Sequence, residues 1–183
     1  MKTLIVSNFR TGSWSLLNSL KENLISFDEI FFQTDNFIIK NKIKEYSKCK
    51  NAIAKLHPIQ AYGPEKDRIR LSSELCEVAD KIIYIQRKDT LQQVISYAVA
   101  RKQHKISNEW KRERNYFTGD LSNNDLDFAF DRLSRNDKII HHLYSNYPGK
   151  VITLEDDLEY NPYPNKFSYS GNWVLPHNFK ILV

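Results

Sequence analysis

Cysteine and glycine are scarce in this 183-residue chain, which has two cysteines and five glycines. Two thiols, Cys49 and Cys76, are too few for a disulfide framework, and neither lies in a zinc-type Cys/His spacing. The small number of glycines, with only six prolines, argues against a flexible linker or a low-complexity tract. We therefore expect a single domain over residues 1–183, with two reduced thiols and no metal.

Long apolar runs are also missing. Residues 1–6 supply only three consecutive aliphatic side chains, whereas a signal peptide has an apolar core of about 7–15 residues. No run approaches the ~18 apolar residues of a membrane-spanning helix. We expect a soluble, cytoplasmic protein with no membrane partner.

Charge is unbalanced, because 27 lysines and arginines exceed 22 aspartates and glutamates and give a net charge of +5. This balance favours anionic partners such as phosphate or sulfate esters, nucleotides or nucleic acid, and does not choose among them. No recognised nucleic-acid-binding motif is present. A non-catalytic nucleic-acid-binding module therefore stays open only as a less favoured alternative.

Apolar patterning alternates between the periods of strands and helices. Continuous apolar runs predict strands, and side chains at helical spacing predict helices. The predicted strands cover 4–6, 52–54, 81–85 and 151–154, and the predicted helices cover 16–24, 91–99 and, as one long or broken helix, 126–144. This alternation predicts an α/β domain with a mainly parallel central sheet flanked by helices. We expect a long polar connection over 104–124 and assign no structure to the tail, 160–183.

The first predicted turn has the composition of an anion-binding turn. After the first strand the chain reads Arg10-Thr11-Gly12-Ser13-Trp14-Ser15 and then enters a helix. Backbone N–H groups at a helix start hold phosphate, and Gly12 allows close approach of the backbone. The turn lacks the second glycine and the lysine of G-x-x-x-x-G-K-[ST], so it is P-loop-like without being a Walker A loop. An ordinary strand-to-helix turn fits these residues equally well.

A second polar group follows the strand at 81–85. Arg87 and Lys88 come directly after it, Asp89 is expected to cap the next helix, and Ser96 lies two turns into that helix. An arginine and a serine beside a helix start can bind a phosphate, although a solvated Arg/Lys pair is the commoner arrangement. Parallel sheets bind ligands at the carboxyl ends of their strands, where both polar groups are expected.

Four ordered stretches, which span about residues 4 to 158, are informative in combination. They are Arg10-Thr11-Gly12-Ser13, Lys55-Leu56-His57-Pro58, the pair Tyr84-Ile85-Gln86-Arg87 and Val94-Ile95-Ser96, and Val151-Ile152-Thr153-Leu154-Glu155-Asp156-Asp157-Leu158. Together they resemble the 3′-phosphoadenosine 5′-phosphosulfate (PAPS)-dependent sulfotransferases, and the sequence over 87–96 is most similar to the trehalose sulfotransferase branch.

The resemblance implies PAPS as the donor and 3′,5′-adenosine bisphosphate (PAP) as the product. It places the 5′-phosphosulfate on the first turn and the 3′-phosphate on Ser96 with either Arg87 or Lys88. Both residues remain candidates for binding this phosphate, because Arg87 precedes Ser96 by nine residues, whereas the common family spacing is eight, which Lys88 has. Trp14 stands where the family usually has a hydroxyl, so a sulfotransferase fold that has lost turnover is one alternative.

For catalysis the resemblance implies that His57 is the base for the acceptor hydroxyl. Arg10 would neutralise charge on the leaving phosphate, and Lys55 would assist at the sulfuryl group. A carboxylate, Glu29 or Asp35, is the fallback base. No metal is required, and His141 and His142 point to different helix faces, which makes them poor joint ligands.

The acceptor is expected to be a carbohydrate or another small molecule, and its identity stays open, as does the oligomeric state. A nucleotide-binding, kinase-like protein is the competing enzyme class, with the missing Walker lysine against it. Two groups are candidates for lining the site. A basic and aromatic cluster is a candidate lid over the cofactor or a surface for an anionic acceptor, although a solvated charged loop is the commoner arrangement, and three tail residues are candidates for the acceptor pocket. They are Lys105, Trp110, Lys111, Arg112, Arg114 and Tyr116 for the lid, and Lys166, Tyr169 and Trp173 for the pocket.

Overall fold

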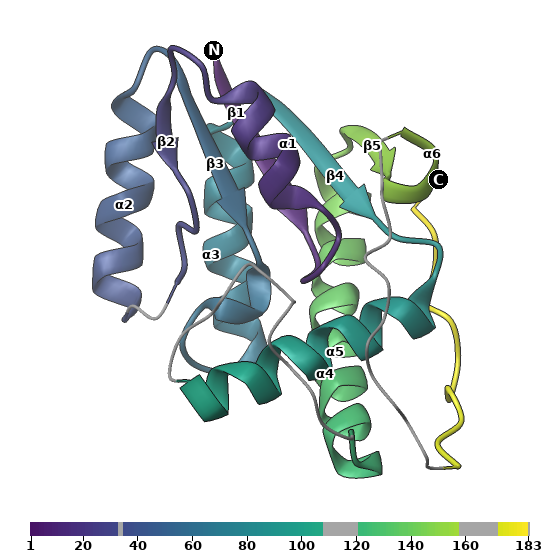
Figure 1. Ribbon diagram of the computed structural model, residues 1–183. Coiled ribbons are helices and arrows are strands. Elements are labelled where there is room, and N and C mark those ends of the chain that lie inside the picture. The colour runs from purple at the N-terminus through teal and green to yellow at the C-terminus, as the bar shows by residue number, and fades with distance from the viewer. Residues whose placement is uncertain (33–34, 108–120, 158–171, 183) are drawn as a thin grey trace.

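The computed structural model describes residues 1–32, 35–107, 121–157 and 172–182. Its five-stranded sheet is parallel throughout, in the order β2-β3-β1-β4-β5 (Figure 1). The strands are β1 (Lys2–Ser7), β2 (Ile25–Phe27), β3 (Ala52–Leu56), β4 (Lys81–Gln86) and β5 (Lys150–Thr153). The helices are α1 (Ser13–Leu20), α2 (Asn36–Lys48), α3 (Glu65–Val78), α4 (Thr90–Ser107), α5 (Asn123–Asn146) and α6 (Leu154–Asp157), with a short 3₁₀ turn, η1 (Pro58–Gln60).

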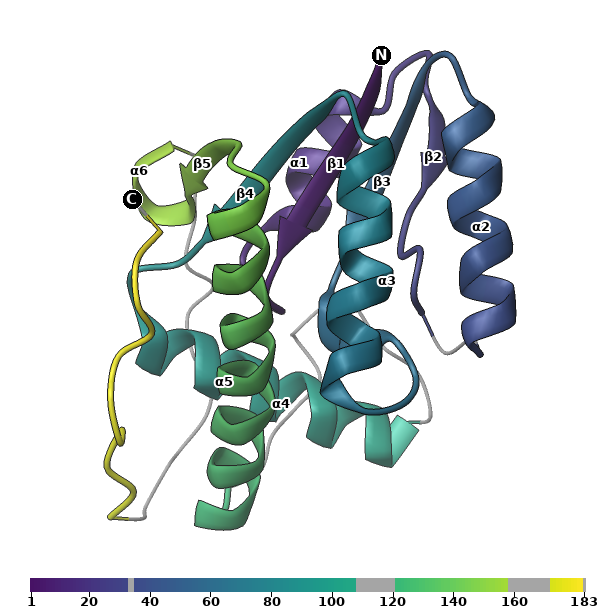
Figure 2. The same ribbon diagram turned by 180° about the vertical axis from the view of Figure 1, so that it is seen from behind.

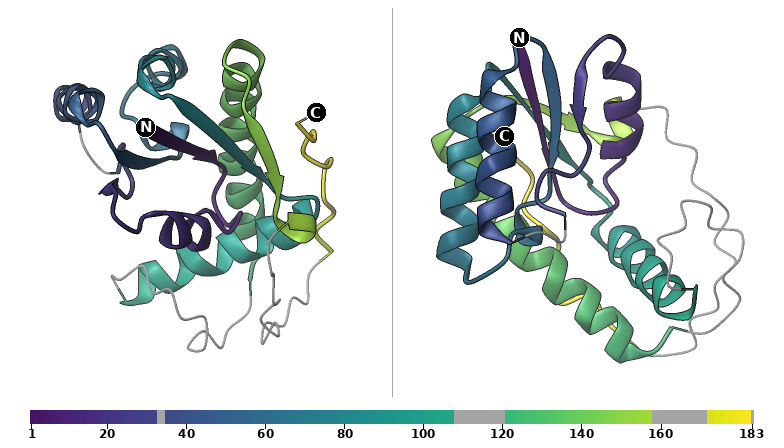
Figure 3. Two further views of the ribbon diagram at one scale, coloured as in Figure 1. Left: turned by 90° about the horizontal axis from the view of Figure 1, so that it is seen from above. Right: turned by 90° about the vertical axis from the view of Figure 1, so that its left-hand side faces the viewer.

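The helices lie in layers on the two faces of the sheet. Helix α1 covers one face, and α2, α3 and α5 cover the opposite face (Figures 1 and 2). Helix α4 runs across the carboxyl ends of the strands (Figure 3). After β1, the chain forms β2 and β3 on one side of β1, and it then forms β4 and β5 on the other side. A change of direction of this kind opens a crevice outside the carboxyl ends of the central strands.

The central strand is buried on both of its faces. Leu4 and Val6 pack into the cluster beneath α2, α3 and α5, whereas Ile5 packs with Leu16 and Leu17 of α1. Successive side chains of a strand point to opposite faces, so an uninterrupted apolar run suits a strand covered twice. This double burial fixes the position of the turn that follows Ser7.

The predicted α/β fold with a parallel sheet is confirmed. The four predicted strands correspond to β1, β3, β4 and β5, and the three predicted helices correspond to α1, α4 and α5, the last without a break. The patterning did not reveal β2, α2 or α3. Helix α1 ends at Leu20, before the predicted 24, and Asn23 has a left-handed backbone (φ 62°) that no helix continues through.

The fold corrects the predicted connection over 104–124 and shows where part of the unassigned tail lies. The connection predicted over 104–124 is wrong at both ends, because α4 continues to Ser107 and α5 begins at Asn123. In the tail, residues 172–182 lie against α5 and β4: Trp173 donates to Asp127 (2.7 Å) and the Leu182 amide donates to Gln86 (2.7 Å). None of the helices in the described ranges has the length and apolarity needed to cross a bilayer.

Candidate functional site at the carboxyl ends of the strands

The turn between β1 and α1 has an unusual backbone. Arg10 (φ 62°) and Gly12 (φ 76°) both have left-handed conformations. Glycine adopts positive φ readily, but arginine does so at a cost, and such residues concentrate at functional sites. Gly12 is the N-cap of α1 and has no side chain to satisfy the first backbone N–H groups. The start of α1 is therefore a suitable anion site.

Buried Asn8 stabilises the turn on its interior side. Its side-chain oxygen accepts from the Phe9 amide (2.9 Å), its amide group donates to the Leu133 carbonyl (2.9 Å), and its own carbonyl accepts from the Thr11 hydroxyl (2.9 Å). From α4, Gln93 donates to the Phe9 carbonyl (2.6 Å). These bonds satisfy the interior side of the turn and fix its conformation.

Asn136 on α5 is fully buried and was not singled out from the sequence. Its side chain donates to the Asn8 side-chain oxygen (3.0 Å) and accepts from the Ile59 amide (2.8 Å) of η1. One amide thus joins the turn after β1 to the turn after β3. No local pattern marks this residue, because its partners come from distant parts of the chain.

The structure brings the first turn and the end of β4 together. Arg10 Nε donates to Ser96 Oγ at 3.0 Å, and Arg87 Nη1 donates to the Arg10 carbonyl at 3.4 Å. Arg87 is buried and also donates from Nε to Glu155 (3.0 Å). The Lys88 side chain is instead exposed and pairs with Asp156. Of the two predicted cations, Arg87 is the one beside the turn.

At the end of β3, Lys55 is buried and points to the α1 side of the sheet. Its Nζ lies 2.8 Å from Glu29 Oε1 and 4.8 Å from the centre of the Trp14 ring. Gln60 donates to the other Glu29 oxygen (2.9 Å). Burial opposes ionisation of Glu29, but its interaction with the protonated form of His57 and with Lys55, and the bonds from Lys55 and Gln60, lower the pKa of this carboxyl below its ordinary value. Trp14 thus covers the cation where a hydroxyl was expected.

His57 lies next to Lys55 and is almost fully buried. Its Nδ1 is 2.9 Å from the Ser7 carbonyl, and its ring packs 4.6 Å from the ring of Phe9. Since a carbonyl only accepts, the proton of the neutral ring is on Nδ1 and Nε2 carries a lone pair. Burial, reinforced by the Lys55 charge, lowers the pKa of His57 to about 4, so the ring is neutral at pH 7.

Other predicted site residues lie elsewhere. Asp35 caps α2 by accepting from the Ile38 amide (2.9 Å), and Ser15 is exposed on α1. Asp89 caps α4 as expected, accepting from the Gln92 amide (2.8 Å). Trp173 packs on α5, against Phe130, and donates to Asp127. The lid cluster at 110–116, the side chain of Lys105, and tail residues 166 and 169 fall outside the described residues.

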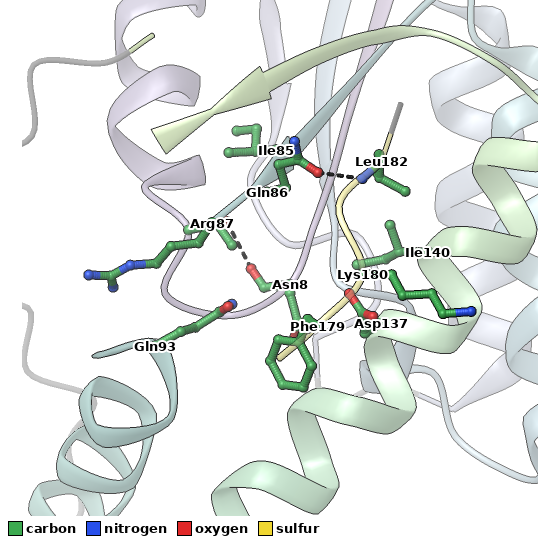
Figure 4. Close-up of a pocket in the computed structure, with 11 residues that line it drawn as sticks. Asn8, Ile85, Gln86, Arg87, Gln93, Asp137, Ile140, Phe179, Lys180 and Leu182 are labelled. Atoms are coloured by element: carbon green, nitrogen blue, oxygen red, sulfur yellow. Dashed lines mark hydrogen bonds between the residues drawn. The ribbon is translucent and has the colours of Figure 1, made fainter. Parts of the chain in front are cut away.

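A small cavity lies behind the turn, between β4, α5 and the C-terminal segment (Figure 4). Its lining includes Asn8, Thr11 and Arg87 on one side and Asp137 and Phe179 on the other. A volume of about 20 Å³ has room for one water molecule. This cavity is too small for a nucleotide. No group of three metal-ligating side chains occurs within the described residues.

Comparison with known proteins adds little to this geometry. No family model matches the chain, and no curated protein sequence matches it. Among solved structures, the chain is similar to a shikimate kinase from Bacteroides thetaiotaomicron, with 12% identity, a TM-score of 0.44, and coverage of 85% of this chain and 89% of that chain. What the fold and the site themselves define is a parallel α/β protein with a P-loop-like turn after its first strand.

Proposed function

We propose that this chain binds the phosphates of a nucleotide on the outer side of the first turn and transfers an anionic group from it to an acceptor hydroxyl. The observation that carries the proposal is the meeting of Arg10, Ser96 and Arg87 beside the uncapped start of α1. Two cationic side chains, a hydroxyl and helix N–H groups are the donors that phosphate and sulfate esters require.

Our sharper proposal for the donor is PAPS, as the sequence resemblance implies. The residues fit a donor with two separate anionic groups, because Arg10 joins the turn to Ser96 on the next helix. Of the two cations left open by the spacing, we assign Arg87 to the 3′-phosphate, since its Nη1 reaches the Arg10 carbonyl of the turn, whereas Lys88 is exposed and pairs with Asp156. When bound, this donor supplies the sulfuryl group for an in-line displacement.

The chain's own residues would then act in three ways. Arg10 and the first N–H groups of α1 balance the negative charge that grows on the leaving phosphate. Lys55, held by Glu29 and Trp14, presents a fixed positive charge near the transferring group. His57 takes the acceptor proton at Nε2, because Nδ1 carries the proton that is donated to the Ser7 carbonyl.

His57 is the better base of the two that remain. Both oxygens of Glu29 already accept hydrogen bonds, from Lys55 and Gln60, and the first of these is an ion pair that taking up a proton would break. His57 is neutral at pH 7 and has a lone pair available. A pKa of about 4 makes His57 a weak base in the free protein. Because a nearby negative charge favours the protonated ring, we expect the bound donor to raise the pKa of His57 towards the working pH.

Phosphoryl transfer from ATP, a kinase-like activity, is the second candidate. A parallel sheet with a phosphate-type turn after its first strand suits a nucleotide kinase in general, and the fold supports this reading no less than the first. The turn has no Walker lysine, and phosphoryl transfer also needs carboxylates for Mg²⁺. The donor therefore has to be determined by binding.

Calorimetric titration with PAP, AMP and ATP, with and without Mg²⁺, separates these candidates. We expect micromolar binding of PAP, much tighter than that of AMP, and Ser96→Ala should weaken PAP binding without affecting AMP. Ser19→Ala on α1, whose hydroxyl donates to the Leu16 carbonyl, is the matched control. Preference for ATP with Mg²⁺ would replace the PAPS donor by the kinase-like one. Failure of all three nucleotides would overturn the proposal.

A further inference from the structure

The net charge of the protein is concentrated on one helix. Residues 36–50, which form α2 and the two residues after it, contain five lysines and one glutamate, a charge of +4 out of the +5 of the whole chain. The remaining residues are therefore nearly balanced. The lysines are Lys40, Lys42, Lys44, Lys48 and Lys50.

Three of these lysines lie on the part of α2 that faces away from the core. The helix buries Ile39, Ile43 and Tyr46, and at 100° per residue the opposite side carries Lys44 and Lys48, with Lys40 on its flank. Lys40, Lys44 and Lys48 are four residues apart and exposed, which spaces them ~6 Å along the axis. Within the described residues none of the five lysines takes part in an ion pair.

Two exposed aromatic side chains lie at the start of the same helix. Phe37 is 73% exposed and shares the outward side of α2 with Lys44. Tyr62 is 74% exposed and belongs to a turn that adjoins α2, since a Cβ on Gly63 would lie 3.8 Å from the Asn36 side chain. Two exposed aromatic rings therefore lie beside the exposed lysines of α2.

We propose that these residues form a binding surface for single-stranded nucleic acid. This α2 surface consists of Lys40, Lys44, Lys48, Phe37 and Tyr62. A row of cations that follows the phosphates, with aromatic rings on which bases stack, is the way proteins hold single strands without reading their sequence. The surface is separate from the first turn, because α2 lies on the face of the sheet opposite α1 (Figure 2).

An anionic membrane is a poorer fit to the same surface. A helix that lies in a bilayer interface buries a broad apolar face in the lipid. In α2 that face is already packed against the sheet and α3 through Ile39, Ile43 and Tyr46. Of the apolar side chains of α2, only Phe37 and Ile38 are exposed, and both lie at one end of the helix.

Fluorescence anisotropy of a short labelled oligothymidylate, measured over a range of salt concentrations, tests the proposal. We expect log K to fall with log salt at a slope of about −0.7 for each phosphate neutralised, hence about −2 for three lysines. The triple variant K40Q/K44Q/K48Q should bind about tenfold or more weakly and lose most of this slope. Phe37→Ser should weaken binding about fivefold or more, with the slope unchanged.

The matched control is K66Q/K81Q/K138Q, which removes the same charge from exposed lysines outside α2. It should bind the oligonucleotide like the wild type. Equal loss in both triple variants, no effect of Phe37→Ser, or stronger binding to a sulfated polysaccharide or to phosphatidylserine vesicles would each overturn the proposal. In either triple variant the denaturation midpoint and the affinity for PAP should stay unchanged, so failure here is distinguishable from failure of the proposed transferase function.

Discussion

The cations of the candidate site and those of α2 are arranged in opposite ways. The side chains of Arg87 and Lys55 are 1% and 3% exposed, and each is paired with a carboxylate, Glu155 and Glu29. Lys40, Lys44 and Lys48 of α2 are exposed and, in the described part of the chain, have no such partner. Buried pairs are costly to desolvate and keep a fixed geometry, whereas exposed charges are mobile and screened by salt. The first arrangement suits a preorganised reaction centre, and the second suits an adaptable surface.

Arg10 of the candidate site combines a polar side-chain contact with an unfavourable backbone conformation. Its guanidinium reaches Ser96, but its backbone has the left-handed conformation that glycine prefers. A residue that serves folding alone would be better replaced by glycine at this position. The conformational cost of arginine therefore supports a role for its side chain in binding or transfer.

Replacing Arg10 with glycine should have the largest effect of the changes considered. Removing the guanidinium should lower the rate of transfer about a hundredfold to a thousandfold, the usual effect of losing one donor to developing charge. The free energy of unfolding should stay within about 1 kcal/mol of the wild type, because glycine relieves the positive φ. Steady-state kinetics and urea denaturation measure the two quantities. A variant with near-normal turnover would remove Arg10 from the reaction centre.

His57 should make the stability of the protein depend on pH. The unfolded chain takes up this proton near pH 6.5, whereas the folded chain takes it up near pH 4. Folding is therefore opposed as pH falls through this interval, by about 3 kcal/mol in total. In His57→Asn, whose amide can still donate to the Ser7 carbonyl, this contribution should disappear.

The measurement for His57 is the difference in unfolding free energy between wild type and variant at pH 7 and at pH 4. A difference is needed because burial raises the pKa of Asp137 to about 6, which acts with the opposite sign over nearly the same interval. Asp137→Asn should therefore change the pH profile in the reverse direction. Parallel profiles for wild type and His57→Asn would show that His57 titrates normally and is not buried as described.

Changing Glu155 to glutamine should have the smallest effect of the three. It removes the charge opposite a buried guanidinium, while the amide oxygen still accepts a hydrogen bond, so we expect a loss of about 2 kcal/mol in unfolding free energy. The affinity for PAP should rise a few-fold, because Arg87 is no longer neutralised. The α2 variant K40Q/K44Q/K48Q is the control, with no change expected in either quantity. Weaker PAP binding in Glu155→Gln would show that Glu155 positions Arg87 for the ligand.

Sequence patterns located those elements whose side chains are buried in long regular runs. Strands β1 and β4 were found because sheet strands covered on both faces are continuously apolar. Strand β2 has three residues at the edge of the sheet, with Ile25 more than half exposed, and gives little signal. Helix α2 did carry a signal, Asp35 as N-cap followed by Ile39, Ile43 and Tyr46 at helical spacing, but the lysines between them obscured it.

The sequence by itself determined the alternation of strands and helices and the anion-binding composition of the first turn, because both depend on neighbouring residues. Only the tertiary structure decided which side chains meet there. Glu155 reaches Arg87 across 68 positions, and Asn136 reaches Asn8 across 128. Tertiary packing also placed α2 at the outside of the fold and left three of its lysines exposed. Pairings over such separations follow from how the helices pack on the sheet, and no local period encodes that packing.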